Sequence, residues 1–363
     1  MNKHACERIY VCHTFYHAYI SCLKELWSGR PQTGAAAIVL SNLSNDFGNL
    51  KERLEKSGVF AEVLEYEEKA AEFFPELDRY RKDRGNIILN MINRIIFTKK
   101  FAKAQIPYLP TDFRNYRDIY VFCDSDPIGY YLNYAKIPYH AVEDGLNCLK
   151  YIDYARYDNR GFFRFKAWMS ARNLIFIQNG YGKYCLDMEV NDISAIHYPC
   201  PKYIEQPRAE LVNGLDDETK ETLLGIFVAD LPALRQKLAS GDKAAPKVLV
   251  LSEPLCDMET RQQIFTDIID QYGQIDGKPA QVLIKQHPRD TLDYHQHFPE
   301  HIILDAQVPM EMLNFIPGVF FDRVVSVLTV TNAIQFAGEI LFLGSDFMDK
   351  YEDPLRHRHN EQI

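Results

Sequence analysis

The segment Val282–Asp290, with the sequence VLIKQHPRD, places a histidine directly behind an apolar run. Residues 282–284 are typical of a buried parallel strand, and Pro288 cannot continue the hydrogen-bond ladder of such a strand. His287 is therefore expected at the carboxyl end of a strand, where open α/β sheets bind their ligands. An imidazole flanked by two cations suits a departing phosphate group, although a strand end with solvated charges would have the same sequence.

Glu143 and Asp144 form a second candidate site, because they stand between an apolar run and Gly145. Adjacent carboxylates raise each other's pKa, so one of the two could act as a base near neutral pH. An Asp-Gly pair is also an ordinary turn signal, and the sequence leaves both interpretations open.

A third candidate, Ser252–Asp257, follows the apolar run 247–251. This loop is expected at the same carboxyl edge as His287, which would bring its serine and aspartate close to a bound ligand. Asp257 also directly precedes a helix that we expect to begin near Met258, so it could instead be the N-cap of that helix.

Thr329 and Thr331 lie in the segment Val325–Asn332, which we expect to pass from a strand into a helix. Hydroxyls beside the amides of a helix start form a natural phosphate cradle, or simply an N-cap. Glu311 stands in an apolar helical turn. Its carboxylate could accept hydrogen bonds from a nucleoside or remain in solvent.

Several nucleotide and hydrolase motifs are absent from the sequence. It contains no Walker loop, no G-x-G-x-x-G, no H-E-x-x-H and no G-x-S-x-G. P-loop, nicotinamide-dependent and serine-hydrolase chemistry are therefore disfavoured. Asp124 and Asp126 form an Asp-x-Asp pair like the metal motif of many sugar-nucleotide transferases, but the following Pro127 favours a loop.

Composition narrows the class of protein further. At 363 residues, with 47% apolar and 25% charged residues, the chain is typical of a globular protein with two domains. The net charge of −9 disfavours a nucleic-acid partner. The eight cysteines include no C-x-x-C pair, which favours a reducing cytoplasm and no zinc site. No apolar run approaches the roughly 18 to 20 residues that span a bilayer, and residues 1–8 lack the core of a signal peptide.

Short apolar strands alternate with helical segments along the N-terminal half. We expect strands at 8–12, 35–40, 60–65, 118–123 and 138–142, and helices at 16–27, 50–57 and 87–103. This alternation predicts a doubly wound parallel sheet.

Prolines at 199, 201 and 207 interrupt this rhythm, and one polar helix is expected at 216–238. Further strands are expected at 247–251, 281–284, 301–304, 323–326 and 339–343. The predicted layout has a Rossmann-like domain at 1–200, a linker with a connecting helix at 201–245, and a second Rossmann-like domain at 246–363. A ligand-binding cleft is expected between the two domains.

The order of three motifs along the chain carries a family resemblance. An acid-Asp-Gly turn at 143–145, a His-Pro pair at 287–288 and a hydroxyl at Thr329 follow one another. The segment 9–17, IYVCHTFYH, is similar to the first strand and loop of the same family. The chain thus resembles the bacterial sialyltransferases, most closely glycosyltransferase family 52, the lipooligosaccharide sialyltransferases. The resemblance covers most of the chain, in short motifs.

The resemblance implies a GT-B fold, CMP-sialic acid as donor and no resident cofactor. It implies metal-free, inverting transfer to a hydroxyl of a cell-surface lipooligosaccharide or capsular glycan. Members of the family can form domain-swapped homodimers. The stretch 160–168, RGFFRFKAW, could rest on the cytoplasmic face of a membrane that carries a glycolipid acceptor. A helix with its aromatic side chains packed inward would have the same composition.

The resemblance also implies roles for individual residues. Glu311 takes the place of a carboxylate near the nucleotide, and Thr329 that of a phosphate-binding serine, whereas Val330 departs from the second hydroxyl of related families. Asp257 takes the place of the catalytic base. In related families the first acid of the acid-Asp-Gly turn has that role, which keeps Glu143 open.

The expected mechanism follows from charge. As the sugar–phosphate bond breaks, the phosphate gains negative charge, which a protonated His287, backbone amides and Thr329 would stabilise. Lys285 and Arg289, on either side of the His287-Pro288 pair, would add field without direct contact.

Two other functions fit the same sequence. A GT-B enzyme that uses another donor, such as a UDP-hexose, would share the fold and differ in its nucleotide pocket. A non-catalytic glycan- or nucleotide-binding protein would also share the fold, but its function would not depend on His287.

Overall fold

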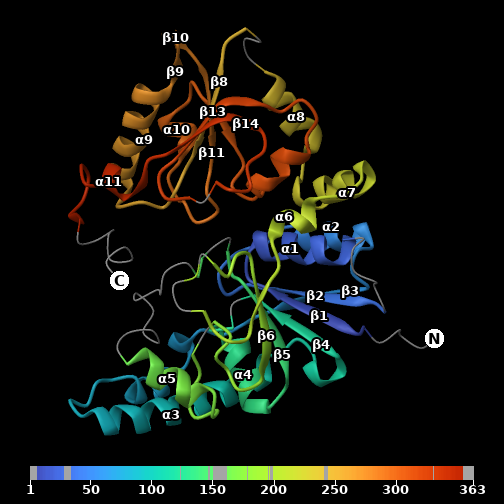
Figure 1. Cartoon of the computed structure of the whole chain (residues 1–363), viewed down its shortest axis with the longest axis vertical. Helices are drawn as coiled ribbons and strands as arrows, with labels where there is room; N and C mark the ends of the chain where they lie inside the picture. The colour runs from blue at the N-terminus through green and yellow to red at the C-terminus, as the bar shows by residue number, and fades with distance from the viewer. Residues whose placement is uncertain are drawn as a thin grey trace. The chain divides into compact units, whose positions relative to one another are not determined.

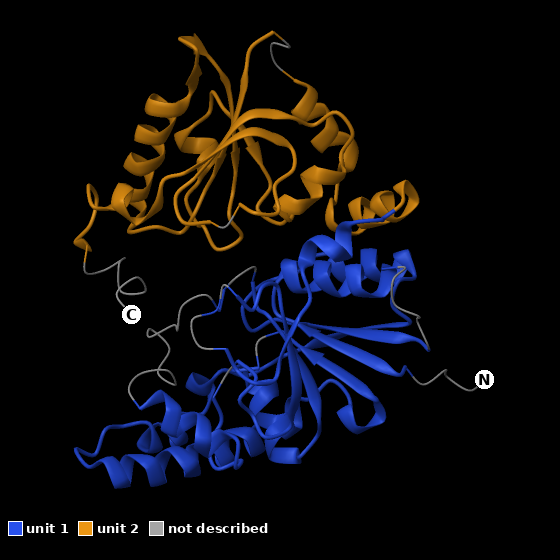
Figure 2. Cartoon of the chain, in the orientation of Figure 1, with its two compact units in different colours: residues 1–215, 363 blue, residues 216–362 orange. Residues whose placement is uncertain are grey.

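The computed structural model describes residues 6–27, 34–122, 124–145, 148–149, 162–177, 179–194, 196, 199–240, 244–329 and 331–354. The chain divides into two compact units, unit 1 (Met1–Leu215) and unit 2 (Asp216–Gln362), shown in blue and orange in Figure 2. Each unit contains a parallel β-sheet with helices on both faces (Figure 1). The α/β class predicted from the sequence is confirmed.

The sheet of unit 1 has the strand order β3-β2-β1-β4-β5-β6-β7, and its neighbouring strands pair in parallel. Its strands are β1 (Arg8–Cys12), β2 (Ala36–Ser41), β3 (Glu62–Tyr66), β4 (Asp118–Val121), β5 (Tyr139–Val142), β6 (Cys185–Val190) and β7 (Tyr203–Glu205). The first five match the predicted strands. The sequence did not reveal β6 and β7, because β6 mixes charged with apolar residues and β7 has only three residues.

Helices α1 (Phe15–Leu26) and α2 (Leu50–Ser57) cover one face of this sheet, and α3 (Ile87–Ala104) and α4 (Pro127–Ala135) lie on the other (Figure 1). Side chains of β1 alternate between the two faces: Ile9 packs in one core with Ile128 of α4, whereas the Tyr10 hydroxyl donates to Glu25 of α1. The remaining elements are α5 (Phe163–Ser170), α6 (Arg208–Val212), and the 3₁₀ turns η1 (Ala71–Phe73), η2 (Pro75–Tyr80), η3 (Ile106–Tyr108) and η4 (Phe113–Asn115).

The sheet of unit 2 has the order β12-β11-β8-β13-β14, again with parallel pairing. Its strands are β8 (Lys247–Leu251), β11 (Gln281–Lys285), β12 (Ile302–Leu304), β13 (Phe321–Ser326) and β14 (Ala337–Phe342), and all five match predicted strands. A short hairpin pairs β9 (Gln274–Ile275) with β10 (Lys278–Pro279). The helical elements are α7 (Asp217–Phe227), α8 (Leu231–Ala239), α9 (Met258–Tyr272), α10 (Tyr294–His297), α11 (Gly344–Met348) and the 3₁₀ turn η6 (Met310–Phe315).

Two sequence-based expectations in unit 2 are wrong. The single helix expected at 216–238 is the pair α7 and α8, because Asp230 caps a new helix whose first turn contains Pro232. The helix expected to begin near Thr329 does not form: the described residues between β13 and β14 make turns and bends. Val327, Thr329 and Thr331 are β-branched, which disfavours a helix here, and the amides of residues 327–329 donate to the side chain of Glu253.

The two sheets share a topology that determines where ligands can bind. In each sheet the second and third strands lie on one side of the first strand, and the fourth and fifth lie on the other. The order in which strands are added to the sheet therefore reverses between β1 and β4 in unit 1 and between β8 and β13 in unit 2. Ligands of open α/β sheets bind outside the carboxyl ends of the strands at such switch points. Among the described residues, no helix has the length and apolar character needed to cross a bilayer.

Candidate active site

His287 follows β11 at the carboxyl edge of the unit 2 sheet, and it is half-buried there. Its backbone amide donates to Ser252 Oγ at 3.0 Å, and its ring Nδ1 accepts from the Arg289 amide at 3.0 Å. An amide can only donate, so Nδ1 carries no proton and the neutral ring has its proton on Nε2. His287 is thus held as a tautomer whose Nε2–H can donate to a ligand.

The charge state of His287 differs from the protonated ring expected from the sequence. Burial, followed by the nearby cations Arg289 and Lys285, lowers its pKa to about 4, against the opposite effect of Asp290. The ring is therefore neutral at pH 7 in the free protein. It offers a hydrogen bond to a phosphate rather than a full positive charge.

Asp290 stabilises the turn that carries His287. This fully buried carboxylate accepts hydrogen bonds from Ser252 Oγ, Arg261 Nη1 and the Tyr294 hydroxyl, each at 2.7 Å. The Asp290 amide donates to the carbonyl of His287 at 2.9 Å. Ser252 therefore orients His287 through its hydroxyl and is itself 2% exposed, which leaves it little surface for the predicted contact with substrate.

Lys285, Pro288 and Glu311 occupy different environments around this edge. Lys285 is 6% exposed, its Nζ donates to the Gln286 carbonyl at 2.6 Å, and burial lowers its pKa to about 8 against the effects of Asp305 and Glu311. Glu311 lies in η6, and burial raises its pKa while Lys285 acts in the opposite direction. Pro288 is exposed at the turn.

Thr329 and Thr331 lie in the loop between β13 and β14. Thr329 is half-buried, and its amide donates to Glu253 Oε1 at 2.9 Å. Thr331 is 9% exposed, and its carbonyl accepts from the Ile334 amide at 3.0 Å. No role for Glu253 was predicted; its position two residues after β8 is the signal that the sequence offers.

Asp257 is the N-cap of α9. Its carboxylate accepts from the amide of Thr260 at 3.0 Å and from its hydroxyl at 2.9 Å, and the Asp257 side chain is exposed. These hydrogen bonds lower the pKa of Asp257. A lowered pKa makes a carboxylate a weaker base, so its role as catalytic base stays a prediction from the family resemblance.

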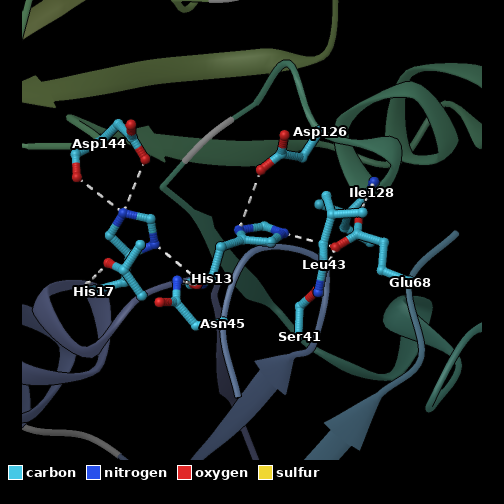
Figure 3. Close-up of polar contacts among 10 residues, drawn as sticks. His13, His17, Ser41, Leu43, Asn45, Glu68, Asp126, Ile128 and Asp144 are labelled. Atoms are coloured by element: carbon cyan, nitrogen blue, oxygen red, sulfur yellow. Dashed lines mark hydrogen bonds and ion pairs between the residues drawn. The ribbon is translucent and has the colours of Figure 1, made fainter. Parts of the chain in front are cut away.

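A buried polar cluster lies at the carboxyl edge of the unit 1 sheet, behind β1 (Figure 3). The His13 amide donates to His17 Nδ1 at 3.0 Å, so the neutral His17 ring carries its proton on Nε2. That Nε2 lies 2.9 Å from both Oδ1 and the carbonyl oxygen of Asp144. His17 is fully buried and stacks on Phe122, with 4.5 Å between ring centroids, and it thereby fixes the Asp144 side chain.

The two acids of the acid-Asp-Gly turn face different environments. Glu143 is 2% exposed and accepts from the Asn191 amide at 2.8 Å; burial raises its pKa. The Asp144 side chain is 40% exposed. Asp144 is therefore the acid of this pair that can reach a ligand, whereas Glu143 holds the loop together.

His13 is a buried cation at the same edge. It is 1% exposed, with its Nε2 2.6 Å from Glu68 Oε2 and its Nδ1 3.5 Å from Asp126. Burial lowers its pKa, but Glu68, Asp126 and Asp144 together outweigh burial and raise the pKa to about 9. The segment 9–17 is prominent in the sequence, but its pattern does not reveal that both histidines bind strand-end carboxylates.

The Asp124–Asp126 loop is held by hydrogen bonds of its own. Asp124 is 2% exposed and accepts from the amides of Asn179 and Gly180 at 2.7 and 3.0 Å. Asp126 lines a cavity of about 700 Å³ whose wall also includes Arg81, Arg94 and Tyr130. This volume lies within the range of small-molecule sites in proteins.

Comparisons with known proteins agree with this fold. A bacterial α-2,3-sialyltransferase from Photobacterium phosphoreum matches with 12% identity and a TM-score of 0.51, over 92% of this chain and 90% of that one. A 2,6-sialyltransferase from a Photobacterium species, in complex with CMP and lactose, matches with 11% identity and a TM-score of 0.56, over 92% of this chain and 71% of that one. The predicted GT-B type fold is confirmed. No curated protein sequence matches the chain.

The family follows from the sequence match. The model of glycosyltransferase family 52 matches residues 89–332, which is more than half of the chain. The protein belongs to glycosyltransferase family 52 and is a glycosyltransferase.

The raised pKa of His13 predicts that unit 1 loses stability in alkaline solution. A pKa raised above the ordinary value of about 6.5 gives stability that is fully present below pH 6.5 and is lost as the pH rises through about 9. Urea unfolding at pH 7 and pH 9.5 should show a loss of about 1–3 kcal/mol in the wild type that His13→Gln lacks. Lys285 titrates in the same pH range, but both proteins contain it. Its effect on the free energy of unfolding therefore cancels in the difference between them. Equal losses in both would contradict the assignment.

Proposed function

We propose that this protein transfers sialic acid from CMP-sialic acid to a glycan hydroxyl, with inversion and without a metal ion. Membership of family 52 and the fold shared with bacterial sialyltransferases support this reaction. The observation that carries it is the orientation of His287, whose Nε2–H is fixed at a strand end by the Arg289 amide and Ser252. The phosphate of a nucleotide sugar can accept a hydrogen bond from this Nε2–H.

Unit 2 would bind the donor. As the bond between the sugar and the phosphate oxygen breaks, negative charge develops on the phosphate, and a hydrogen bond from His287 Nε2 strengthens with that charge. The growing charge also raises the proton affinity of the ring, which offsets the burial and the cations that keep it neutral in the free protein. Glu311 would accept hydrogen bonds from the nucleoside, in the role that the family resemblance implies.

Unit 1 would supply the base, and the structure favours Asp144 for it. Asp144 is 40% exposed and oriented by His17, whereas Glu143 is buried against backbone amides and Asp257 is used as a helix cap. The base removes the proton of the acceptor hydroxyl as that oxygen forms its bond to the sugar. His17 acts as a positioning residue, because it contacts Asp144 and not the substrate.

The acceptor glycan would bind unit 1 at the cavity beside Asp126. Arg81 and Arg94 line this cavity and can donate to sugar hydroxyls or to acidic substituents. A lipooligosaccharide or capsular glycan is the acceptor that the family resemblance implies.

The assay that tests this proposal measures CMP release from CMP-sialic acid with lactose as acceptor, in the presence of EDTA. We expect turnover to persist in EDTA, and Asp144→Asn to lower kcat by about 10²–10⁴-fold because the base is lost. Asp257→Asn is the matched control and should keep most of the activity, because asparagine also caps the N-terminus of a helix. Release of UDP from a UDP-hexose, with no release of CMP, would show that the donor is a UDP-hexose and not CMP-sialic acid. Loss of all turnover in EDTA, or an inactive Asp257→Asn beside an active Asp144→Asn, would refute the corresponding part of the mechanism.

A glycolipid acceptor would bring the enzyme to a membrane surface, and α5 offers one place for contact. The interpretation in which all aromatics of 160–168 face inward is wrong, because Phe165 and Trp168 are 44% and 47% exposed and stack on each other. Arg172 lies 3.9 Å from the Trp168 ring and adds positive charge. Arg160 and Gly161 lie outside the described residues. Exposed aromatics beside cations favour anionic lipid surfaces.

Co-sedimentation with anionic vesicles tests this contact. The double variant Phe165→Ala/Trp168→Ala should bind at least about 30-fold more weakly than the wild type, since burying each aromatic ring in the interface contributes about 1–2 kcal/mol. Leu186→Ala, which removes another exposed apolar side chain, is the control. Equal binding of all three proteins would exclude α5 as the contact. The cytoplasmic location that the cysteine pattern favours and the homodimer that the family resemblance implies stay predictions.

A further inference from the structure

Glu253 occupies an anion-binding turn at the end of β13. The amides of three consecutive residues, Val327, Leu328 and Thr329, donate to its carboxylate at 2.9–3.1 Å. The Thr329 side chain also lowers the pKa of this carboxylate. Successive amides that converge on one point form a nest, a backbone geometry that binds anions such as phosphate.

The nest lies where a doubly wound sheet binds its ligand. Glu253 follows β8, and residues 327–329 follow β13, so their contact marks the switch point of the unit 2 sheet. The hydroxyl of Thr329 is also the group that the family resemblance assigns to the donor phosphate. The backbone amides that are expected to bind this phosphate thus already donate hydrogen bonds to a carboxylate of the same chain.

A carboxylate and a phosphate cannot share this nest. Both are anions, and like charges at contact distance repel strongly in a site from which water is excluded. Glu253 is 5% exposed, and burial raises its pKa against the opposing effect of the three amides. Its carboxylate is therefore desolvated, and its bonds to the nest are of the kind that the anionic non-bridging oxygens of a phosphate can replace.

We infer that Glu253 is an internal stand-in for the donor phosphate: it keeps the 327–329 turn folded in the free enzyme and is displaced when the nucleotide binds. This inference rests on the proposed function, because it takes the phosphate of the CMP donor as the group that enters the nest. Part of the binding free energy of the nucleotide is spent on displacing Glu253, and Glu253 therefore lowers the affinity of unit 2 for phosphate-bearing ligands.

Binding of CMP and of cytidine to the full chain, by isothermal titration calorimetry, tests this competition. Glu253→Gln removes the charge and keeps the shape, and should tighten CMP binding by about five- to tenfold, since a neutral amide competes less well for the nest. Cytidine has no phosphate, so its affinity should stay within about twofold of the wild-type value. Glu300→Gln, which alters an exposed glutamate of the same unit, should change neither affinity. CMP affinity that is unchanged or weaker in Glu253→Gln would overturn the inference.

Hydrogen–deuterium exchange separates this inference from the identity of the nucleotide. In Glu253→Ala the amides of 327–329 should exchange rapidly in buffer and become protected on addition of inorganic phosphate, whereas in the wild type they are protected without it. If the wild type fails to bind CMP but phosphate protects the nest of Glu253→Ala, the proposed donor is wrong and the nest inference holds. If phosphate gives no protection in Glu253→Ala, the nest inference is wrong whichever nucleotide binds.

Discussion

The hydrogen bonds of the buried Asp290 carboxylate are the interaction on which the proposed donor site in unit 2 depends. The carboxylate gathers a serine from the β8 loop, an arginine from α9 and a tyrosine from α10 around the turn that carries His287. Removal of one partner of a buried ion pair leaves an uncompensated charge, at a cost of about 3–5 kcal/mol. The turn is therefore held rigidly, and the His287 ring is oriented before any substrate arrives. A hydrogen-bond donor that is fixed in advance needs no reorganisation during the reaction.

Unit 1 uses the same principle with the roles of the groups exchanged. There a fully buried histidine, His17, orients a half-exposed carboxylate, Asp144, whereas in unit 2 a fully buried carboxylate orients a half-exposed histidine. In both units the backbone decides the proton position on the imidazole: an amide donates to Nδ1 and leaves the proton on Nε2. Asp144 and His287 both lie on turns that follow parallel strands, which is where the Rossmann topology places its ligands.

The sequence predicted the fold well and the site only in part. Ten strands were recognised because buried parallel strands are short apolar runs, but β6, with its charged residues, was not. His287 was located because proline and the strand pattern fix its position. Its charge state could not be predicted, since it depends on burial and on cations that only the folded chain brings near. The helix expected at Thr329 is absent among the described residues, where β-branched Val327, Thr329 and Thr331 disfavour it, and the sequence could not show that amides of this turn bind the distant side chain of Glu253.

The proposed catalysis depends on donation of a hydrogen bond from the Nε2–H of a neutral His287 to the departing phosphate. The most direct measurement compares steady-state turnover of CMP-sialic acid by the wild type, His287→Ala and His287→Gln, with CMP affinity measured alongside. Because His287→Ala lacks the hydrogen bond from Nε2, its kcat should be about 10²–10⁴-fold lower, while CMP binding weakens by less than about tenfold. Glutamine can place an amide N–H near the position of Nε2, so His287→Gln should retain more activity than His287→Ala. Wild-type turnover in His287→Ala would contradict the account.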